Sequence, residues 1–112
     1  MAKYGDIMFS GKSGEKYCFH AWPLETRFKS LGGVYFVTKR VFKNKNYDRA
    51  SHEGIYIGQT NNLADPFGTQ SQLDRFKKHG ANCICVYPLE NEEQRLAVEQ
   101  DMIAGNNTFC NE

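Results

Sequence analysis

Two runs rich in β-branched and aromatic residues restrict the fold of this chain more than any other feature of its sequence. Residues 33–41 (GVYFVTKRV) and residues 54–60 (GIYIGQT) both have the composition of β-strands. The polar, basic residues 43–53 lie between them and suit an exposed loop or an extended hairpin tip. The two runs are therefore expected to pair as antiparallel strands.

A β-hairpin is expected near the amino terminus, because apolar and polar residues alternate in residues 6–9 and 16–22 around the turn-forming segment SGKSG. Further along, Asp65 followed by Pro66 predicts the N-cap and the first residue of a helix. This helix is expected to run to about His79, where Gly80 ends it.

A strand and a second helix are predicted in the last third of the chain. Residues 82–87 have the pattern of a buried strand, which Pro88 closes. Asn91 with Gln94 three residues later forms a capping box, and the helix that follows is expected to end at Gly105. The order of elements predicts a small α+β domain, with a central antiparallel or mixed sheet flanked by helices.

The composition excludes several classes of protein. The 112 residues fit one domain, and eight Phe, six Tyr and one Trp are too many for a disordered chain. No window is long and apolar enough to span a membrane, and residues 1–10 lack the apolar core of a signal peptide. A cytoplasmic protein without a membrane partner is therefore expected.

The cysteines are expected to be reduced thiols: Cys18, Cys83, Cys85 and Cys110. In the run CICVY, Cys83 and Cys85 suit a buried strand in which cysteine acts as a small hydrophobic residue. A zinc site is not expected, because the chain has no Cys-x2-Cys pair and its histidines are scattered: His20, His52 and His79.

Glu99 is the most informative residue of the last helix. It lies within the apolar stripe that Leu96, Met102 and Ile103 define at helical spacing. A carboxylate there must be paired with a basic side chain, protonated or bound to a cation. On helix geometry alone, a structural salt bridge and a metal-binding or catalytic role are equally open.

Two tyrosines lie next to glycines in the central strands. Strand alternation places Tyr56 on the same face as Gly54 and Gly58, whose missing side chains would leave its phenol in an open patch. Tyr35 occupies the neighbouring strand. Ordinary cross-strand pairing of the two tyrosines is the alternative.

These residues together resemble the GIY-YIG nuclease family: GVY at residues 33–35, YIGQTNNL at residues 56–63, Glu99 and Asn111. The resemblance implies a GIY-YIG-like domain over residues 31–112, with residues 1–30 as an additional N-terminal β-hairpin packed on it. It also implies hydrolysis of DNA phosphodiester bonds with one Mg²⁺ or Mn²⁺ ion held by Glu99. Tyr35 or Tyr56 would activate the attacking water, and Asn111 would complete the site.

The chain departs from the family at two positions. Pro66 stands where the family has its catalytic arginine, and Gln70 stands where many members have a histidine. Arg75 and His79 keep the family's arginine-to-histidine spacing nine residues later. They would occupy the family's places if residues 66–71 form an inserted loop.

The start of the first helix decides between the two interpretations. Gly68 and the polar residues after it allow a late N-cap at Ser71, which favours the insertion. An uninterrupted helix from Pro66 would instead carry Arg75 about 13 Å farther along the axis, outside the site. The register from Tyr56 to Gly80 needs no insertion, so the second interpretation is favoured, in which the arginine and histidine are absent.

A basic, aromatic-rich segment between the two tyrosine strands favours contact with DNA phosphates, and a solvated polar loop is the alternative. The net charge of +1 hides this segment, because residues 1–50 carry +6 and residues 51–112 carry −5. The expected DNA-binding residues are Lys39, Arg40, Lys43, Lys45, Arg49, Lys77 and Lys78.

The sequence therefore predicts a GIY-YIG-type DNA endonuclease. One alternative is a catalytically impaired domain of the same fold that binds DNA or a protein partner. Another is a small α+β binding module in which Tyr35, Tyr56 and Glu99 are structural. In a domain of this size, a homodimer or a protein partner would supply the specificity.

Overall fold

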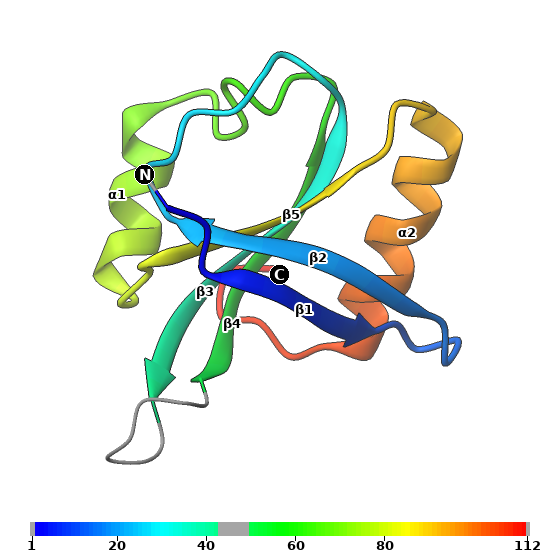
Figure 1. Ribbon diagram of the computed structural model, residues 1–112, viewed down its shortest axis with the longest axis horizontal. Coiled ribbons are helices and arrows are strands. Elements are labelled where there is room, and N and C mark those ends of the chain that lie inside the picture. The colour runs from blue at the N-terminus through cyan, green and yellow to red at the C-terminus, as the bar shows by residue number, and fades with distance from the viewer. Residues whose placement is uncertain (1, 43–49, 112) are drawn as a thin grey trace.

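Five strands form one antiparallel sheet in the order β1-β2-β5-β3-β4, with two helices beside it (Figure 1). The computed structural model describes residues 2–42 and 50–111. An α+β fold is therefore confirmed. The elements are β1 (Gly5–Ser10), β2 (Lys16–Pro23), β3 (Gly33–Phe42), β4 (Ala50–Thr60), α1 (Gln70–Lys78), β5 (Cys83–Pro88) and α2 (Glu92–Gly105).

The predicted antiparallel pairing of the two tyrosine strands is confirmed, but β4 begins earlier than expected. Its pairing with β3 runs from Gly33 opposite Thr60 to Phe42 opposite Ala50. Residues 50–53 therefore belong to the strand, which agrees with an extended hairpin rather than with an exposed loop over these residues. Backbone hydrogen bonding continues past the apolar run because β-pairing does not require apolar side chains on both faces.

The β1–β2 hairpin is a part of the same sheet and curls over it. Strand β2 pairs with β5, and Figure 1 shows β1 and β2 crossing in front of β3 and β4. The ring of Phe9 on β1 lies 4.7 Å from the ring of Phe36 on β3, although two strands separate β1 from β3 in the sheet. The hairpin tip is fastened to α2, because Asp101 accepts hydrogen bonds from the hydroxyls of Ser13 and Tyr17.

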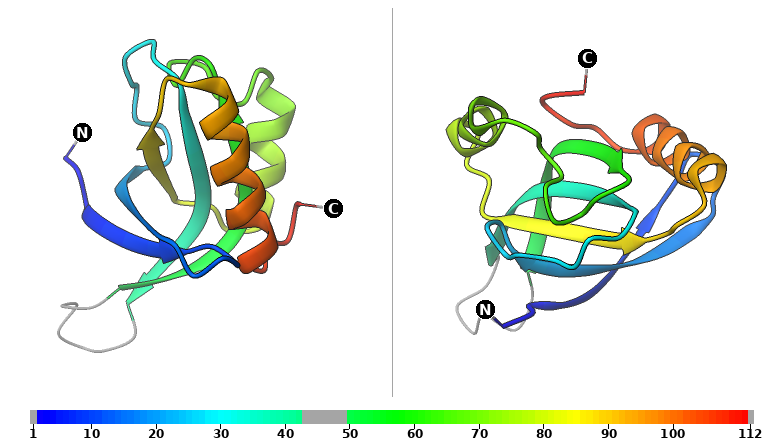
Figure 2. Two further views of the ribbon diagram at one scale, coloured as in Figure 1. Left: turned by 90° about the vertical axis from the view of Figure 1, so that its right-hand side faces the viewer. Right: turned by 90° about the horizontal axis from the view of Figure 1, so that it is seen from above.

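The sheet separates two apolar cores. The core on the α1 side is anchored by the fully buried Phe76, and the core inside the curl includes Met102 of α2. The two helices lie on opposite sides of the sheet in Figure 2, as this division requires. The sheet contributes Tyr35, Val37, Ile55, Ile84 and Val86 to the first core, and Phe19, Val34, Phe36, Ile57, Cys83 and Cys85 to the second.

Helix α2 starts and ends as the sequence predicts, whereas α1 does not. Asn91 caps α2 by accepting a hydrogen bond from the backbone N–H of Gln94, and the helix ends at Gly105. The prediction that α1 begins at Pro66 is wrong. Thr69 is its N-cap, since its hydroxyl accepts from the backbone N–H of Gln72.

The late start of α1 has a local cause. Gly68 has a φ of +75°, a left-handed conformation that ends any helical path from Pro66 and that glycine adopts at little cost. In the described part of the chain, neither helix is long and apolar enough to cross a bilayer.

Candidate functional site

Tyr35 and Tyr56 meet on the α1 side of the sheet. Their ring centroids are 6.0 Å apart, with Tyr35 buried and Tyr56 half-buried. Gly58 makes this arrangement feasible, because a Cβ atom there would lie 2.6 Å from the Tyr35 hydroxyl oxygen. The space left by Gly58 is thus filled by the end of the Tyr35 ring.

The predicted position of Gly54 beside Tyr56 is wrong. A Cβ atom on Gly54 would meet Phe36 and the carbonyl of Asn107 on the other side of the sheet. The register between β3 and β4 shifts between Val37 and Thr38. A bulge of this kind adds one residue to a strand and reverses the side on which the following residues point.

Glu99 lies at the junction of α2 with β4. Burial raises the pKa of its carboxylate, and the side chain of Gln100 and the backbone N–H of Gln59 act in the opposite direction. Burial raises the pKa of the Tyr35 phenol well above its usual value. The neighbouring Tyr56 and the charge of Glu99 raise this pKa further. The structure therefore brings Tyr35 and Tyr56 into contact, and the charge of Glu99 acts on Tyr35 from α2.

The apolar stripe of α2 differs from the predicted one. Leu96 is exposed, with 40% of its surface accessible, whereas Met102 is fully buried and Ile103 half-buried. Arg95 occupies the inward position instead, with only 5% exposed. Positions 95, 98, 99, 102 and 103 form the inward face, so Glu99 lies on it as predicted.

Arg95 is a residue that the sequence analysis missed. Its guanidinium donates hydrogen bonds to the side chain of Gln59 and to the carbonyls of Leu89 and Glu90. Gly32 leaves room for it, because a Cβ atom there would lie 2.5 Å from an Arg95 nitrogen. A buried cation thus stands one helical turn before Glu99, beside a hollow of about 320 Å³ lined by Gln59, Thr60, Asn61, Glu92 and Arg95.

Arg75 contacts the carboxyl-terminal segment that lies along β4. Its guanidinium donates a hydrogen bond of 3.3 Å to the carbonyl of Cys110, whose own N–H donates to the carbonyl of Ile55. The next residue of α1, Phe76, stacks on the ring of Tyr56 with centroids 5.0 Å apart. Pro66 lies outside α1, so the 13 Å displacement expected from a helix starting at Pro66 does not apply.

His79 and Gln70 lie at the two ends of α1. Gln70 is the first residue of the helix, and its amide donates to Asp74. His79, at the C-cap, is exposed and stacks on Phe109 with an interplanar angle of 9°. His79 therefore lies against the carboxyl-terminal segment.

Asn111 binds the backbone of β4 rather than another site residue. Its amide donates to the carbonyl of Ile57 at 2.8 Å, and its carbonyl accepts from the N–H of Ile57 at 2.6 Å and from the hydroxyl of Thr108 at 2.8 Å. Because β4 is an edge strand, its outward backbone groups need partners. The N–H of Cys110 and the side chain of Asn111 satisfy backbone groups of residues 55 and 57 in turn.

The predicted DNA-binding residues do not form one described surface. Lys39 lies against Gly80 at the end of α1, whereas the next residue, Arg40, packs over the ring of Tyr4, which precedes β1. Lys77 forms an ion pair with Glu25, and Lys78 is exposed on the same helix. Lys43, Lys45 and Arg49 lie outside the described residues.

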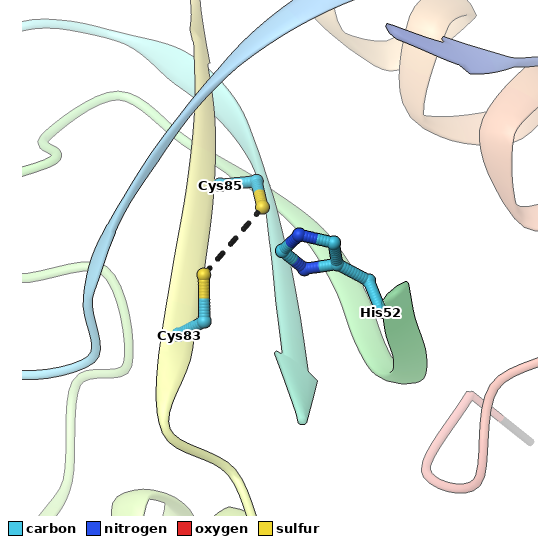
Figure 3. A group of neighbouring side chains, drawn as sticks. All are labelled: His52, Cys83 and Cys85. Atoms are coloured by element: carbon cyan, nitrogen blue, oxygen red, sulfur yellow. Dashed lines mark hydrogen bonds between the residues drawn. The ribbon is translucent and has the colours of Figure 1, made fainter. Parts of the chain in front are cut away.

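Within residues 2–42 and 50–111, Glu99 and a cluster around His52 are candidates for holding a metal ion. Glu99 offers one half-buried carboxylate, which fits a hard divalent cation that takes its other ligands from water and phosphate. The second group is His52, Cys83 and Cys85, whose ligand atoms all lie within 4.8 Å of one another (Figure 3). Hydrogen bonds from Cys85, His52 and Thr38 lower the pKa of the Cys83 thiol in spite of its burial.

The conclusion that the histidines are scattered is wrong for His52. Residues that are distant in sequence meet because β3 and β5 are neighbours in the sheet and β4 pairs with β3. Neither the spacing of the cysteines nor the position of His52 in the sequence could have indicated this. No family model, curated protein or solved structure matches the chain.

Proposed function

We propose that this protein is a GIY-YIG-type endonuclease that hydrolyses DNA phosphodiester bonds. The observation that carries the proposal is the contact of Tyr35 on β3 with Tyr56 on β4, together with the Glu99 carboxylate of α2, whose charge acts on Tyr35. A lone tyrosine pair is common in sheets, but a desolvated carboxylate beside it is not needed for sheet packing. The resemblance of the surrounding motifs to that family gives this constellation its chemical interpretation.

The two tyrosines would have different roles. The raised pKa of Tyr35 makes its phenol a poor source of a base, so Tyr35 would remain protonated and hold Tyr56 in place by a hydrogen bond. Tyr56 is the more exposed of the two and would contact the attacking water. This division assigns positioning to Tyr35 and catalysis to Tyr56.

Arg75 would take the part of the arginine that the family has at the place of Pro66. The late start of α1 and the hydrogen bond from Arg75 to Cys110 support this assignment. The guanidinium of Arg75, the residue before the Phe76 that stacks on Tyr56, would bind the two phosphate oxygens that gain charge in the transition state. Lys39, Lys77 and Lys78 lie on or beside the same helix and would attract the DNA backbone.

Glu99 would hold a Mg²⁺ or Mn²⁺ ion. When bound, such a cation neutralises charge on the scissile phosphate and on the leaving oxygen. The burial that raises the pKa of Glu99 also favours a cation there, because an ionised carboxylate without a partner is costly in a desolvated position. The N–H of Gln59 orients the carboxylate.

Nicking of supercoiled plasmid DNA with Mg²⁺ or Mn²⁺ tests the proposal. We expect Glu99→Gln, Tyr56→Phe and Arg75→Ala each to lower the nicking rate by at least 100-fold, the usual scale for groups that act on the reacting atoms. The matched controls are Glu93→Gln on the exposed face of α2 and Lys16→Ala on β2, which should retain the wild-type rate. Wild-type nicking no faster than that of Glu99→Gln would refute the proposal.

A second candidate function is DNA or protein binding without cleavage. Proline and glutamine at positions 66 and 70, together with the burial of Tyr35, favour it. A gel shift of a DNA duplex without nicking would then be expected, lost when Lys77 and Lys78 are both changed to Ala. A homodimer or a protein partner would be expected to supply specificity in either case, and sedimentation velocity measures the first.

A further inference from the structure

A cluster of two thiols and an imidazole lies inside the curl of the sheet, apart from the tyrosine site. Cys83 and Cys85 are on one face of β5, are fully buried and have their sulfur atoms 3.9 Å apart. His52 reaches them from β4, across β3 (Figure 3). All three ligand atoms lie within 4.8 Å of one another.

The spacing of the sulfur atoms fits a tetrahedral metal ion. With metal–sulfur distances of about 2.3 Å, two thiolates on a tetrahedral zinc ion lie roughly 3.8 Å apart. A disulfide fits less well, because its sulfur atoms must approach to about 2.05 Å. The two Cα atoms, two residues apart on an extended strand, are separated by roughly 6.8 Å, the upper limit for a disulfide.

Thr38 holds the imidazole in the orientation that a ligand needs. Its hydroxyl and Nδ1 of His52 are 2.8 Å apart, which leaves Nε2 on the side of Cys85 (Figure 3). Histidine ligands in metalloproteins are held in the same way, by a hydrogen bond to the ring nitrogen that does not bind the metal. Thr38 is itself fully buried, so this contact is a fixed part of the core.

The charge of the two thiolates, and the hollow beside His52, indicate which metal ion fits this cluster. Two thiolates balance the charge of a divalent ion, so the complex would be neutral in a core that includes Phe9 and Phe36, whereas a monovalent copper ion would leave one negative charge buried. His52 and Arg40 line a hollow of about 270 Å³, and a water molecule on the His52 side would be the fourth ligand. We propose that His52, Cys83 and Cys85 bind one zinc ion, with Thr38 positioning His52.

Binding of Zn²⁺ to the reduced, metal-free full-length chain tests this proposal, with Co²⁺ as a spectroscopic probe. We expect one equivalent of Zn²⁺, and with Co²⁺ the intense visible absorption and sulfur-to-metal charge transfer of a tetrahedral thiolate site. At a free Zn²⁺ concentration 100 times the dissociation constant, the melting temperature should rise by about 10 °C. Cys83→Ala, Cys85→Ala and His52→Gln should each weaken Zn²⁺ binding at least 100-fold, and Thr38→Val 10- to 100-fold.

Matched controls make the result specific. Cys18→Ser and His20→Gln change the same residue types on β2, where Cys18 is exposed, and should leave Zn²⁺ affinity unchanged. Glu99→Gln should also leave it unchanged, which separates this site from the proposed nuclease centre. If a Cys83 or Cys85 variant fails to fold, the Co²⁺ spectrum of the folded His52→Gln protein decides.

Three results would overturn the proposal. The first is the absence of stoichiometric Zn²⁺ binding by the reduced wild-type chain. The second is Zn²⁺ binding that is lost with Cys18→Ser but kept with Cys83→Ala. The third is a chain that binds Cu⁺ at this cluster but rejects Zn²⁺.

Discussion

Replacement of Asn111 by alanine separates a structural role of this residue from a catalytic one. In the structure, the Asn111 amide bridges the N–H and the carbonyl of Ile57, at 2.6 and 2.8 Å. Ile57 is fully buried, so these two backbone groups have little access to water. Alanine removes both partners at once and leaves a donor and an acceptor of the edge strand β4 unpaired.

The cost follows from these contacts. Each lost hydrogen bond contributes about 1 kcal/mol, and an unsatisfied buried group raises this figure. The hydroxyl of Thr108, which also donates to Asn111, is half-buried and can turn to water, so it adds little. Asn111→Ala should therefore lower the free energy of unfolding by about 2–3 kcal/mol. For a domain of this length, that corresponds to a melting temperature lower by roughly 8–13 °C.

Thermal unfolding followed by circular dichroism measures this change, with Asn107→Ala as the matched control. Asn107 is exposed in the same carboxyl-terminal segment, and its replacement should shift the melting temperature by no more than about 2 °C. If Asn111 served catalysis alone, Asn111→Ala would keep the wild-type melting temperature and lose DNA nicking. Equal melting temperatures for the two variants would therefore refute the structural reasoning.

Three further predictions concern Gly58 and Glu99 near the two tyrosines, and Asp101, which fastens the β1–β2 hairpin to α2. Gly58→Ala places a Cβ atom against Tyr35 and Tyr56, so it should lower the free energy of unfolding by about 1–3 kcal/mol. Urea unfolding measures this change, and an unchanged urea midpoint would contradict the packing. Glu99→Gln should raise the melting temperature at pH 7 without divalent cations, because the raised pKa of Glu99 makes its ionised form destabilising. This gain should vanish below about pH 4.5, where Glu99 is protonated in both the folded and the unfolded protein. The hydrogen bonds from Ser13 and Tyr17 lower the pKa of Asp101, so its contribution to stability is present above about pH 3.8 and is lost as the pH falls through its lowered pKa. Asp101→Asn should therefore flatten the decrease of melting temperature between pH 4 and pH 2, and an unchanged pH profile would argue against this contact.

Short-range sequence patterns predicted the strands and helices of this fold wherever backbone preference and side-chain periodicity indicated the same structure. The run GVYFVTKRV became β3, and Asn91 with Gln94 formed the cap of α2. The boundaries of β4 and α1 were missed for different reasons. Strand β4 continues into polar residues because β3 supplies backbone partners there, and α1 starts late because of the left-handed Gly68.

The candidate site was predicted only in part. Glu99 was found because a carboxylate interrupts an apolar stripe, a signal that is present in the sequence itself. Arg95 was missed, since an arginine next to Leu96 gives no sign of burial until Gly32 and Gln59 enclose it. The positions of Arg75 and His79 depend on where α1 begins and how the carboxyl-terminal segment crosses it.

The sequence by itself determined which segments form strands and helices, and which motifs accompany the two tyrosines. Side-chain alternation and capping act over a few residues, so they can be recognised without knowledge of the rest of the chain. Only the tertiary structure decided that β1 curls over β3, that Asn111 completes the edge of β4, and that His52 meets Cys83 and Cys85. These contacts join residues 27 or more positions apart, and strand order and sheet curvature, which no local pattern encodes, bring them together.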